Sequence, residues 1–274
     1  MKAKKLITNS ICHVVLAILS VIWVLPIFYV ILTSFREESG SYKSYIWPRG
    51  FTLDNYAQLI EGSSLINFKQ WFVNTFVIAI FSALISTFLV LCVSYVMSRL
   101  KFKMRRPFLN IALVLGMFPG FMGMTAIYII MTQLGLIDKL ESLIFYYSAT
   151  APLGYMVQKG YFDSIPNTIF EAARLDGATN LQVFTKVTLP LSKSMLVYTV
   201  LTQFAWPWSD VLLPKLLLKD RNMWTVAVGL FNLPETHFAR FAAGAVFIAI
   251  PIVILYFCLV KHIVNGLTAG SVKG

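Results

Sequence analysis

The sequence predicts an all-α, polytopic membrane protein that crosses the bilayer about six times. Of the 274 residues, 58% are hydrophobic and only 13% are charged, whereas a soluble domain carries about 25% charged residues to cover its surface. The mean hydropathy is +0.73, and the apolar residues gather in long runs. Because backbone polar groups cannot stay unpaired in hydrocarbon, we expect these runs to be helices.

The apolar runs define the predicted transmembrane helices. A spanning helix needs roughly 20 apolar residues to cross a hydrocarbon core about 30 Å thick. Five windows meet or nearly meet this length: residues 11–32, 72–97, 108–134, 195–213 and 241–260. A sixth window, 143–157, is shorter and more polar, and is taken as a span because the chain must return to the side that it left. Together they form one transmembrane domain over residues 1–274.

The first window could also be a secretory signal peptide, because Lys2, Lys4 and Lys5 precede it. The apolar core of a signal peptide is about 7–15 residues long, and this window is longer. It is also followed by Arg36. We therefore expect an uncleaved first span.

The charges predict which side of the membrane each loop occupies. With six spans and a cytoplasmic N-terminus, 14 of the 23 Lys and Arg residues lie in the cytoplasm with 3 acidic residues, so this side carries the net charge of +11. Outside, 9 basic and 9 acidic residues cancel. This asymmetry follows the positive-inside rule and predicts that both termini are cytoplasmic. Because the basic residues flank apolar runs, we expect no nucleic-acid binding.

Several features are expected between and within the spans. The long external segment 36–70 should contain a short helix over about 53–60, with Asp54 near its start, where a carboxylate favours the free N–H groups. Pro119 should break the third span, since proline removes a helix hydrogen bond. The break is either a structural kink or a site that lines a cavity. Asp210 either faces protein or water inside the membrane, or lies at the outer interface within a tryptophan belt; we favour the latter.

Neither the three cysteines nor the three histidines have the spacing of metal ligands. The cysteines all lie inside apolar windows, where they suit packing as small hydrophobic residues. The histidines lie in three separate segments. We expect no metal site.

The segment between the fourth and fifth spans, residues 164–190, is the most informative. Ser164 can cap a helix and Pro166 fits its first turn. Gly177 can adopt the left-handed conformation that ends a helix. A second short helix should follow, with Phe184 and Val187 on its apolar side, until Leu189-Pro190 begins the next span.

The first of these two short helices has a predicted apolar face. Ile165, Ile169, Ala172 and Ala173 share one side at helical spacing. The two adjacent alanines make this side shallow, so another backbone can approach it closely. The alternative is a loop that packs only on the transmembrane helices of its own chain.

The pattern Glu-Ala-Ala, three residues, Gly, and later Leu-Pro resembles the EAA motif of binding-protein-dependent ABC importer permeases. The matching residues are Glu171, Ala172, Ala173, Asp176, Gly177, Ala178, Phe184, Leu189 and Pro190. The resemblance implies that this helix is a cytoplasmic coupling helix, which inserts into a cleft of the ATPase subunit.

The resemblance extends over nearly the whole chain. Residues 51–56 (Phe-Thr-Leu-Asp-Asn-Tyr), 71–75 (Trp-Phe-Val-Asn-Thr) and 94–99 (Ser-Tyr-Val-Met-Ser-Arg) are similar to the carbohydrate-uptake branch. The ending, 265–274, resembles the smaller permease subunit of maltose-type importers. One departure is Ser194, where the family often has proline.

The resemblance implies a permease subunit of an ATP-driven sugar importer, of maltose or malto-oligosaccharide type, in the bacterial cytoplasmic membrane. The chain contains no G-x-x-x-x-G-K-[ST] motif, so it cannot bind ATP through a P-loop. It is therefore expected to be no enzyme and to bind no cofactor, with ATP and Mg on a separate ATPase. The implied partners are two ATPase subunits, a second homologous permease subunit and an extracellular sugar-binding protein. The alternatives are an ion-coupled secondary transporter, which would show internal repeats and midplane ionisable residues, and a membrane enzyme, which would need a catalytic cluster.

Two further sets of candidate residues follow from the permease interpretation. Sugars bind well to aromatic faces and polar edges, so polar and aromatic members of spans three to five are candidates for the substrate pathway. These residues are Tyr128, Tyr146, Tyr147, Gln203, Trp206 and Asp210. The alternative is that the aromatic side chains face lipid or neighbouring helices. In addition, the maltose-type resemblance suggests that the tail, with Lys273 and Gly274, reaches the ATPase.

Overall fold

The structure is a computed structural model, and its secondary structure is helical, as predicted. It describes residues 2–38, 40–43, 45–63 and 66–271, with side chains described for 9–38, 40–43, 45–63, 66–151 and 154–261. Within these residues, β pairing is limited to two isolated bridges, Arg36 with Phe51 and Gly40 with His237.

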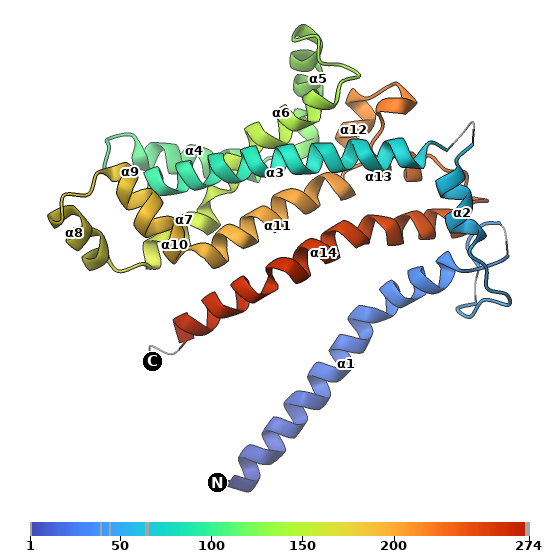
Figure 1. The fold of residues 1–274 in the computed structure, drawn as a ribbon, viewed down its shortest axis with the longest axis horizontal. Helices are drawn as coiled ribbons and strands as arrows, with labels where there is room; N and C mark the ends of the chain where they lie inside the picture. The colour runs from blue at the N-terminus through green and yellow to red at the C-terminus, as the bar shows by residue number, and fades with distance from the viewer. Residues whose placement is uncertain (1, 39, 44, 64–65, 272–274) are drawn as a thin grey trace. The chain divides into compact units, whose positions relative to one another are not determined.

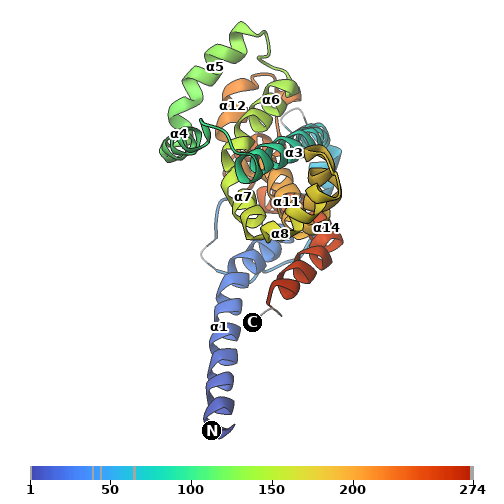
Figure 2. The ribbon, with the colours of Figure 1, turned by 90° about the vertical axis from the view of Figure 1, so that its left-hand side faces the viewer.

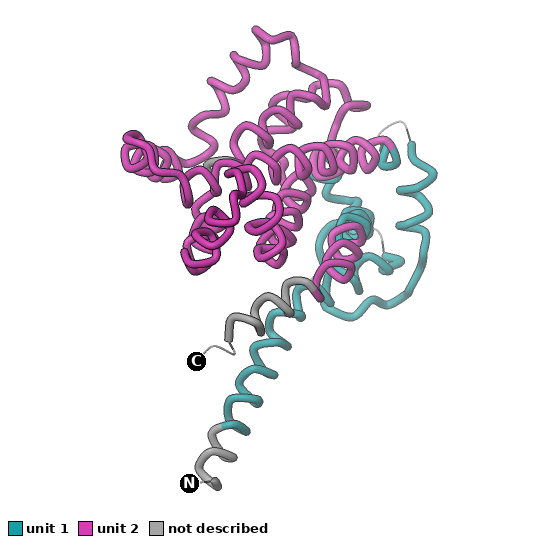
Figure 3. The backbone as a smooth tube through the Cα atoms, turned by 60° about the vertical axis from the view of Figure 1, so that its left-hand side comes forward, with its two compact units in different colours: residues 1–69, 230–249 teal, residues 70–229, 250–274 magenta. Residues whose placement is uncertain are grey.

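The backbone divides into two compact units (Figure 3). Unit 1 comprises residues 1–69 and 230–249, and unit 2 comprises residues 70–229 and 250–274. The coupling segment and all six candidate pathway residues belong to unit 2.

Three long helices correspond to the first, second and last predicted spans. They are α1 (Lys2–Ser34), α3 (Phe68–Arg99) and α14 (Phe238–Ser271), and Figure 1 shows each as a continuous helix. Each contains a stretch that is long and apolar enough to cross a membrane. The helices extend beyond the predicted windows because polar residues at their ends continue the helical backbone past the apolar run.

The third predicted span is broken, as its proline suggested. Helix α4 (Arg105–Met117) and the helical pair η1 (Gly120–Gly123) and α5 (Met124–Gln133) are bent by 95° relative to each other. Figure 2 shows this bend. At the break Phe118 and Pro119 are extended, with ψ of 130° and 126°. Proline has no N–H to donate, so the helix cannot continue through it.

The two remaining windows are also divided. The window 143–157 falls on α6 (Leu140–Thr150), η2 (Ala151–Gly154) and α7 (Tyr155–Ser164). The window 195–213 falls on α11 (Lys193–Ser209) and α12 (Leu212–Leu217). By length and composition, three of the described helices can span a membrane, or four if α4 and η1–α5 are counted as one bent span. The other predicted crossings are therefore built from shorter helices.

In unit 1, the residues after α1 fold back onto its C-terminal end. Helix α2 (Asp54–Glu61) begins at Asp54, close to the predicted position. The side chain of Asn55 donates to the backbone carbonyls of Ser34 (3.1 Å) and Arg36 (2.8 Å). The hydroxyls of Tyr56 and Ser34 are 2.6 Å apart. Residues 51–56, noted above for their family resemblance, thus connect α2 to the end of α1.

In unit 2, α3 contacts α6 and α7 through small hydroxyl side chains. Ser86 donates to the carbonyl of Tyr147 (3.3 Å), and Ser94 donates to the carbonyl of Tyr155 (3.1 Å). Helices in a membrane gain little from the hydrophobic effect, so small residues that allow close approach and interhelical hydrogen bonds stabilise their packing. Helix α3 is therefore the element against which the functional segments of unit 2 are placed.

The N-terminal part of α3 holds the loop that precedes α13 (Val226–Phe231). Trp71 Nε1 donates to a carbonyl of segment 221–226 at 2.7 Å, and Asn74 Nδ2 donates to two others at 2.7 and 3.0 Å. Thr75 Oγ1 accepts from the N–H of Val226 at 2.8 Å. Residues 71–75, whose pattern resembles the carbohydrate branch, thus satisfy backbone groups that are 148 to 151 residues away in the sequence.

Candidate functional site

The coupling segment starts with a short helix at the predicted place. Helix α8 spans Asn167–Leu175 and follows an extended Pro166, with ψ of 134°. The predicted cap by Ser164 is wrong, because α8 begins only after Pro166 and Ser164 lies too far upstream. The hydroxyl of Ser164 instead donates to the carbonyl of Tyr161 at 2.7 Å.

The end of α8 is formed as predicted by Gly177. Its φ is +82°, in the left-handed region that costs glycine no side-chain clash. The N–H of Gly177 donates to the carbonyl of Arg174, and the N–H of Ala178 donates to that of Ala173, both at 3.0 Å. These two bonds form a Schellman motif, which satisfies carbonyls at the helix end and reverses the chain.

The second short helix predicted in this segment is present and is irregular. Thr179 and Gln182 form a capping box at the start of α9 (Asn180–Gln182), with bonds of 2.8 and 3.3 Å. A π-helical turn, η3 (Val183–Thr188), and α10 (Leu189–Leu191) follow. The expectation that Leu189-Pro190 starts the next span needs correction, because Ser192 interrupts the helix and α11 begins at Lys193.

The predicted apolar face of α8 is divided between its two sides. The buried side holds Phe170, which is 3% exposed and packs in one cluster with Ile165, Phe162 and Val183; Ala173 lies partly buried beside them. The helix is oriented by this phenylalanine, which the prediction left out of the face.

The other side of α8 is open. Ile169 and Ala172 are exposed there, and Leu175 is 89% exposed. Leu181, at the start of the second limb, is 70% exposed. Of the other predicted coupling residues, Glu171, Asp176 and Gly177 are exposed and Ala178 is partly buried. Leu175 was missed in the prediction, although its spacing from Ala172 could have indicated it.

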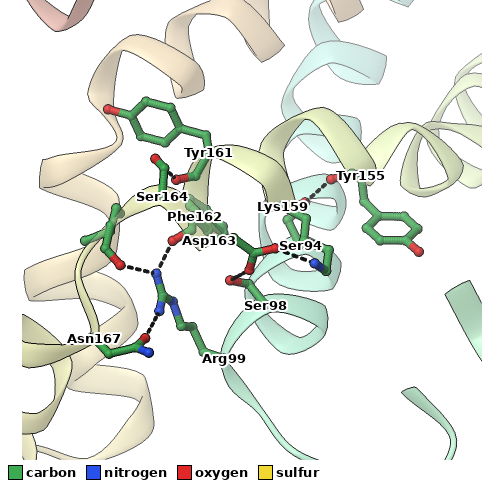
Figure 4. A network of polar contacts seen from close by, with 11 residues as sticks. Ser94, Ser98, Arg99, Tyr155, Lys159, Tyr161, Phe162, Asp163, Ser164 and Asn167 are labelled. Atoms are coloured by element: carbon green, nitrogen blue, oxygen red, sulfur yellow. Dashed lines mark hydrogen bonds and ion pairs between the residues drawn. The ribbon is translucent and has the colours of Figure 1, made fainter. Parts of the chain in front are cut away.

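The end of α3 contacts the junction of α7 and α8 through Arg99 (Figure 4). Its guanidinium donates to Asn167 Oδ1 (2.7 Å), to the carbonyl of Ile165 (3.0 Å) and to the carbonyl of Phe162. The guanidinium carbon is 3.8 Å from the centroid of the Phe170 ring, which is a cation–π contact. The sequence predicted no contact for Arg99, which appeared there only as the last residue of the 94–99 pattern.

A second polar contact lies beside the first and joins α3 to α7 alone (Figure 4). Ser98 Oγ donates to Asp163 Oδ1 at 2.6 Å, and Lys159 forms an ion pair with the same carboxylate. Burial alone raises the pKa of Asp163, but the hydrogen bonds from Lys159 and Ser98 outweigh it, so the pKa lies below its ordinary value.

Helix α3 also contacts the second limb of the segment. The hydroxyl of Tyr95 donates to the carbonyl of Asn180 at 3.1 Å. The rings of Tyr95 and Phe184 have centroids 4.8 Å apart. Residues 94–99, noted for their family pattern, therefore bind both limbs of the coupling segment.

Three of the six candidate pathway residues lie together. The hydroxyl of Tyr147 donates to Asp210 Oδ2 at 2.9 Å, and the rings of Tyr146 and Tyr147 are 5.5 Å apart. Asp210 follows the last residue of α11, and its other oxygen accepts from the N–H of Leu213, in the first turn of α12, at 3.4 Å. Tyr128 packs against the same apolar cluster as both tyrosines.

The other two candidate pathway residues are not joined to this group. Gln203 is half-buried on α11, and Trp206, one turn later, is 62% exposed. Within the described part of the chain, no hydrogen bond or ring contact links either side chain to Tyr147 or Asp210.

An apolar groove of about 580 Å³ lies elsewhere in unit 2. It is formed by α3, α11 and residues 250–258 of α14, and its lining includes Phe72, Phe204 and Pro251. None of the six candidate pathway residues lines it. The groove offers few polar groups for hydroxyl-rich ligands, and it does not coincide with the predicted pathway residues.

The remaining predicted features concern metals and the tail. No group of three or more His, Cys, Asp or Glu residues in the described ranges is placed to hold a metal ion. The predicted tail contacts, Lys273 and Gly274, lie outside the described residues.

The chain is similar to several known proteins. A family model described as binding-protein-dependent transport system inner membrane component matches residues 91–268. The chain is 34% identical to the galactooligosaccharides transport system permease protein GanQ of Bacillus subtilis (strain 168), over 100% of this chain and 99% of that protein. It is 35% identical to the maltodextrin transport system permease protein MdxG of the same strain, over 97% of both chains. The maltose/maltodextrin transport system permease protein MalG of Vibrio parahaemolyticus is 33% identical over 92% of this chain and 91% of its own.

A solved structure shares the fold. It is a bacterial ABC transporter involved in the import of the acidic polysaccharide alginate, with a TM-score of 0.74 and 24% identity, and the match covers 93% of this chain and 96% of that one. Together with the family match, this likeness confirms the predicted fold class, an all-α polytopic membrane protein.

Proposed function

Because this chain belongs to the family of binding-protein-dependent transport system inner membrane components, we propose that it passes maltodextrin-type oligosaccharides through an ATP-driven importer and that α8 couples it to the ATPase. The family itself consists of non-catalytic ABC permease subunits. The chain is thus a multi-pass protein of the cytoplasmic membrane, it is not an enzyme, and it binds no cofactor. ATP is handled by a separate subunit.

The sugar class is supported by the relatives. GanQ, MdxG and MalG carry names that refer to galactooligosaccharide, maltodextrin and maltose transport, at 33 to 35% identity and over 91% or more of both chains. All three names denote transport of sugars, so the chain is the permease of a sugar importer. We propose maltodextrin-type oligosaccharides because two of these three relatives, and the resemblance of residues 265–274, point to them.

The coupling role is carried by one observation, the two-sided build of α8. Its inner side is held by Phe170 and Arg99 against α3, while its outer side exposes Ala172 and Leu175. A short helix with a rigid back and a shallow, apolar front is suited to insertion into a cleft of another protein. Leu181 extends this front onto the second limb.

The partners follow from the same proposal. The family name refers to a binding protein, and the importer complex includes that protein and the ATPase. We propose two ATPase subunits, a second homologous permease subunit and an extracellular sugar-binding protein. The orientation with both termini in the cytoplasm places α8 on the ATPase side of the membrane, and the charge distribution supports it.

Two further assignments belong to the proposal. The substrate pathway includes Tyr128, Tyr146, Tyr147 and Asp210, whose proximity supports a common lining; Gln203 and Trp206 would contribute separately. The tail with Lys273 and Gly274 contacts the ATPase, so deletion of residues 268–274 should lower uptake or its coupling to ATP use.

The decisive experiment is substitution at the front of α8. Ala172→Trp and Leu175→Asp should reduce the amount of ATPase subunit that copurifies with membranes, and sugar uptake should fall with it. Ala126→Trp, the same bulky change at an exposed alanine of α5, serves as the control and should leave both unchanged. Full ATPase retention and normal uptake in both α8 variants would show that α8 is only a surface helix.

The substrate is tested separately. Uptake by vesicles that contain the complete importer should be observed with maltotriose and should depend on ATP and not on a proton gradient. Uptake of a galacto-oligosaccharide without maltotriose would overturn the maltodextrin assignment and leave the permease assignment intact.

A further inference from the structure

We propose that Arg99 is a positioning residue that fixes α8 to the end of α3, so that a displacement of α8 moves α3 with it. The proposal rests on the coupling role of α8 argued above. It assigns to Arg99 a function that neither its position after an apolar run nor the family pattern indicates.

The chain itself does not hold α8 rigidly. Between α7 and α8, Ile165 and Pro166 are extended, with ψ of 127° and 134°. Beyond α8, the chain turns at Gly177 with φ of +82°. Neither connection continues the helical hydrogen bonding, so rotation about the backbone bonds of these connections would let α8 move without moving its neighbours. A side-chain contact is needed to transmit a displacement of α8 to α3.

Arg99 supplies that contact at both sides of the first connection. One guanidinium nitrogen donates to Asn167 Oδ1 on α8, and the other donates to the carbonyls of Phe162 and Ile165 at the end of α7. The last carbonyls of a helix carry partial negative charge, so a cation is favoured there. A single group therefore spans α7, the linker and α8.

The flat guanidinium of Arg99 also packs on the ring of Phe170, on the buried side of α8. It lies 3.8 Å from the ring centroid of Phe170, a residue that is only 3% exposed. Arginine can stack on a ring while its planar set of N–H groups donates to several oxygens, whereas the ammonium of lysine is a compact point charge. The geometry thus demands arginine and not merely a positive charge.

The neighbouring contact makes the role of Arg99 separable. Ser98 of α3 donates to Asp163 of α7, and Lys159, also of α7, pairs with the same carboxylate. This contact therefore connects α3 to α7 and not to α8. When Arg99 is replaced, α7 should stay in place while α8 gains freedom. Replacing Arg99 should therefore change the position of α8 and weaken the coupling between movements of α8 and α3. It should not change the insertion of the spans into the membrane.

The test uses the complete importer in proteoliposomes with Arg99→Lys and Arg99→Gln. Lys101→Gln, which removes an exposed charge two residues later, is the matched control. Spin labels are placed on α3 and on α8, at Val96→Cys and Arg174→Cys, in a chain whose three native cysteines are replaced by alanine. We measure the distance distribution between the labels, the ATPase retained, and the sugar taken up per ATP hydrolysed.

Both Arg99 variants should broaden the distance distribution and lower uptake per ATP severalfold, with the ATPase retained, and Lys101→Gln should match the parent. An unchanged distribution and unchanged uptake per ATP in Arg99→Gln would overturn the proposal. Full function in Arg99→Lys would also overturn the proposal, since a positive charge alone would then be enough at this position. Loss of the ATPase from either variant would overturn it as well, since Arg99 would then act in docking of the ATPase. Failure of the coupling proposal is distinguishable, because it would appear as full ATPase retention by Ala172→Trp.

Discussion

The indole ring of Trp71 packs directly on Gly229, so that a Cβ atom at position 229 would lie 2.0 Å from Cε3 of the ring. Trp71 is 1% exposed, and its Nε1 donates to the carbonyl of Arg221 at 2.7 Å. The ring is therefore held in place by packing and by a hydrogen bond. This contact joins α3 to α13 and needs a residue without a side chain.

Gly229→Ala should destabilise the protein by about 1–3 kcal/mol, because the buried ring cannot move aside without strain. The measurement is the apparent unfolding temperature of the purified protein in detergent. Gly116→Ala is the control, since a Cβ there meets nothing within 4 Å. An unfolding temperature for Gly229→Ala equal to that of the control would contradict the contact.

Gly177→Val should strain the backbone at the end of α8 without a clash against any neighbouring residue. A Cβ at Gly177 has no neighbour within 4 Å, but the residue has φ of +82°, and such a conformation costs other residues roughly 1–2 kcal/mol. Gly177→Asn should be milder, because asparagine tolerates this region better than other residues. ATPase retention and sugar uptake should follow the order Gly, Asn, Val. Equal values for valine and asparagine would argue against a backbone effect.

Tyr147→Phe should leave Asp210 Oδ2 without its hydrogen-bond donor. Tyr147 is 5% exposed, and removing one partner of a buried bond costs about 1–3 kcal/mol. The apparent stability in detergent should fall, and the loss should be smaller in an Asp210→Asn background. Tyr146→Phe provides the control, because its hydroxyl makes no hydrogen bond within the described residues. A loss of equal size in both tyrosine variants would exclude a specific role of the Tyr147–Asp210 bond.

Asp163→Asn should reduce stability at neutral pH and have less effect in acid. The pKa of Asp163 is lowered from its ordinary value of 3.8, so the ionised carboxylate stabilises the folded state above that value, and this contribution fades as the pH falls below it. The side chain is 41% exposed, so solvent screening keeps the effect small. Unfolding temperatures of the parent and the variant, measured across pH, should converge at low pH. A difference in unfolding temperature that stays constant at all pH values would contradict a stabilising role of the Asp163 charge.

Single cysteines should reveal the orientation of the chain. In a background without native cysteines, Ser63→Cys should react with an impermeant maleimide added outside intact cells. Gly274→Cys should react only after the cells are permeabilised, because the positive-inside rule places the C-terminus in the cytoplasm. Reaction of both positions from outside would refute the predicted topology.

Much of the fold was predictable because its signals are local. Apolar windows indicated α1, α3 and α14, and Pro119 indicated the break between α4 and α5. The end of α8 at Gly177 was also predictable. In each case the residue itself constrains its own backbone or its own contact with lipid. The lengths of the helices and the division of the remaining windows were less predictable, because they depend on neighbouring elements.

The candidate site was predictable in position and less so in orientation. The pattern around Glu171 located the coupling segment, but the face of α8 that points inward was chosen by Phe170, which packs with Phe162 and Val183. The four residues Ile165, Ile169, Ala172 and Ala173, predicted to share one face, therefore lie on two different sides. An isolated helical pattern with apolar residues on most sides does not specify which side meets the protein.

By itself, the sequence determined that the chain is a membrane-spanning helical protein with a short, glycine-ended helix between its fourth and fifth predicted spans. Only the tertiary structure decided that Arg99 contacts Phe170, that Tyr147 bonds Asp210 and that Trp71 packs on Gly229. Backbone preference and burial in lipid are properties of individual residues and short runs, so sequence reports them directly. Contacts between residues more than 60 positions apart depend on which helices become neighbours, and that is settled only when the whole chain packs.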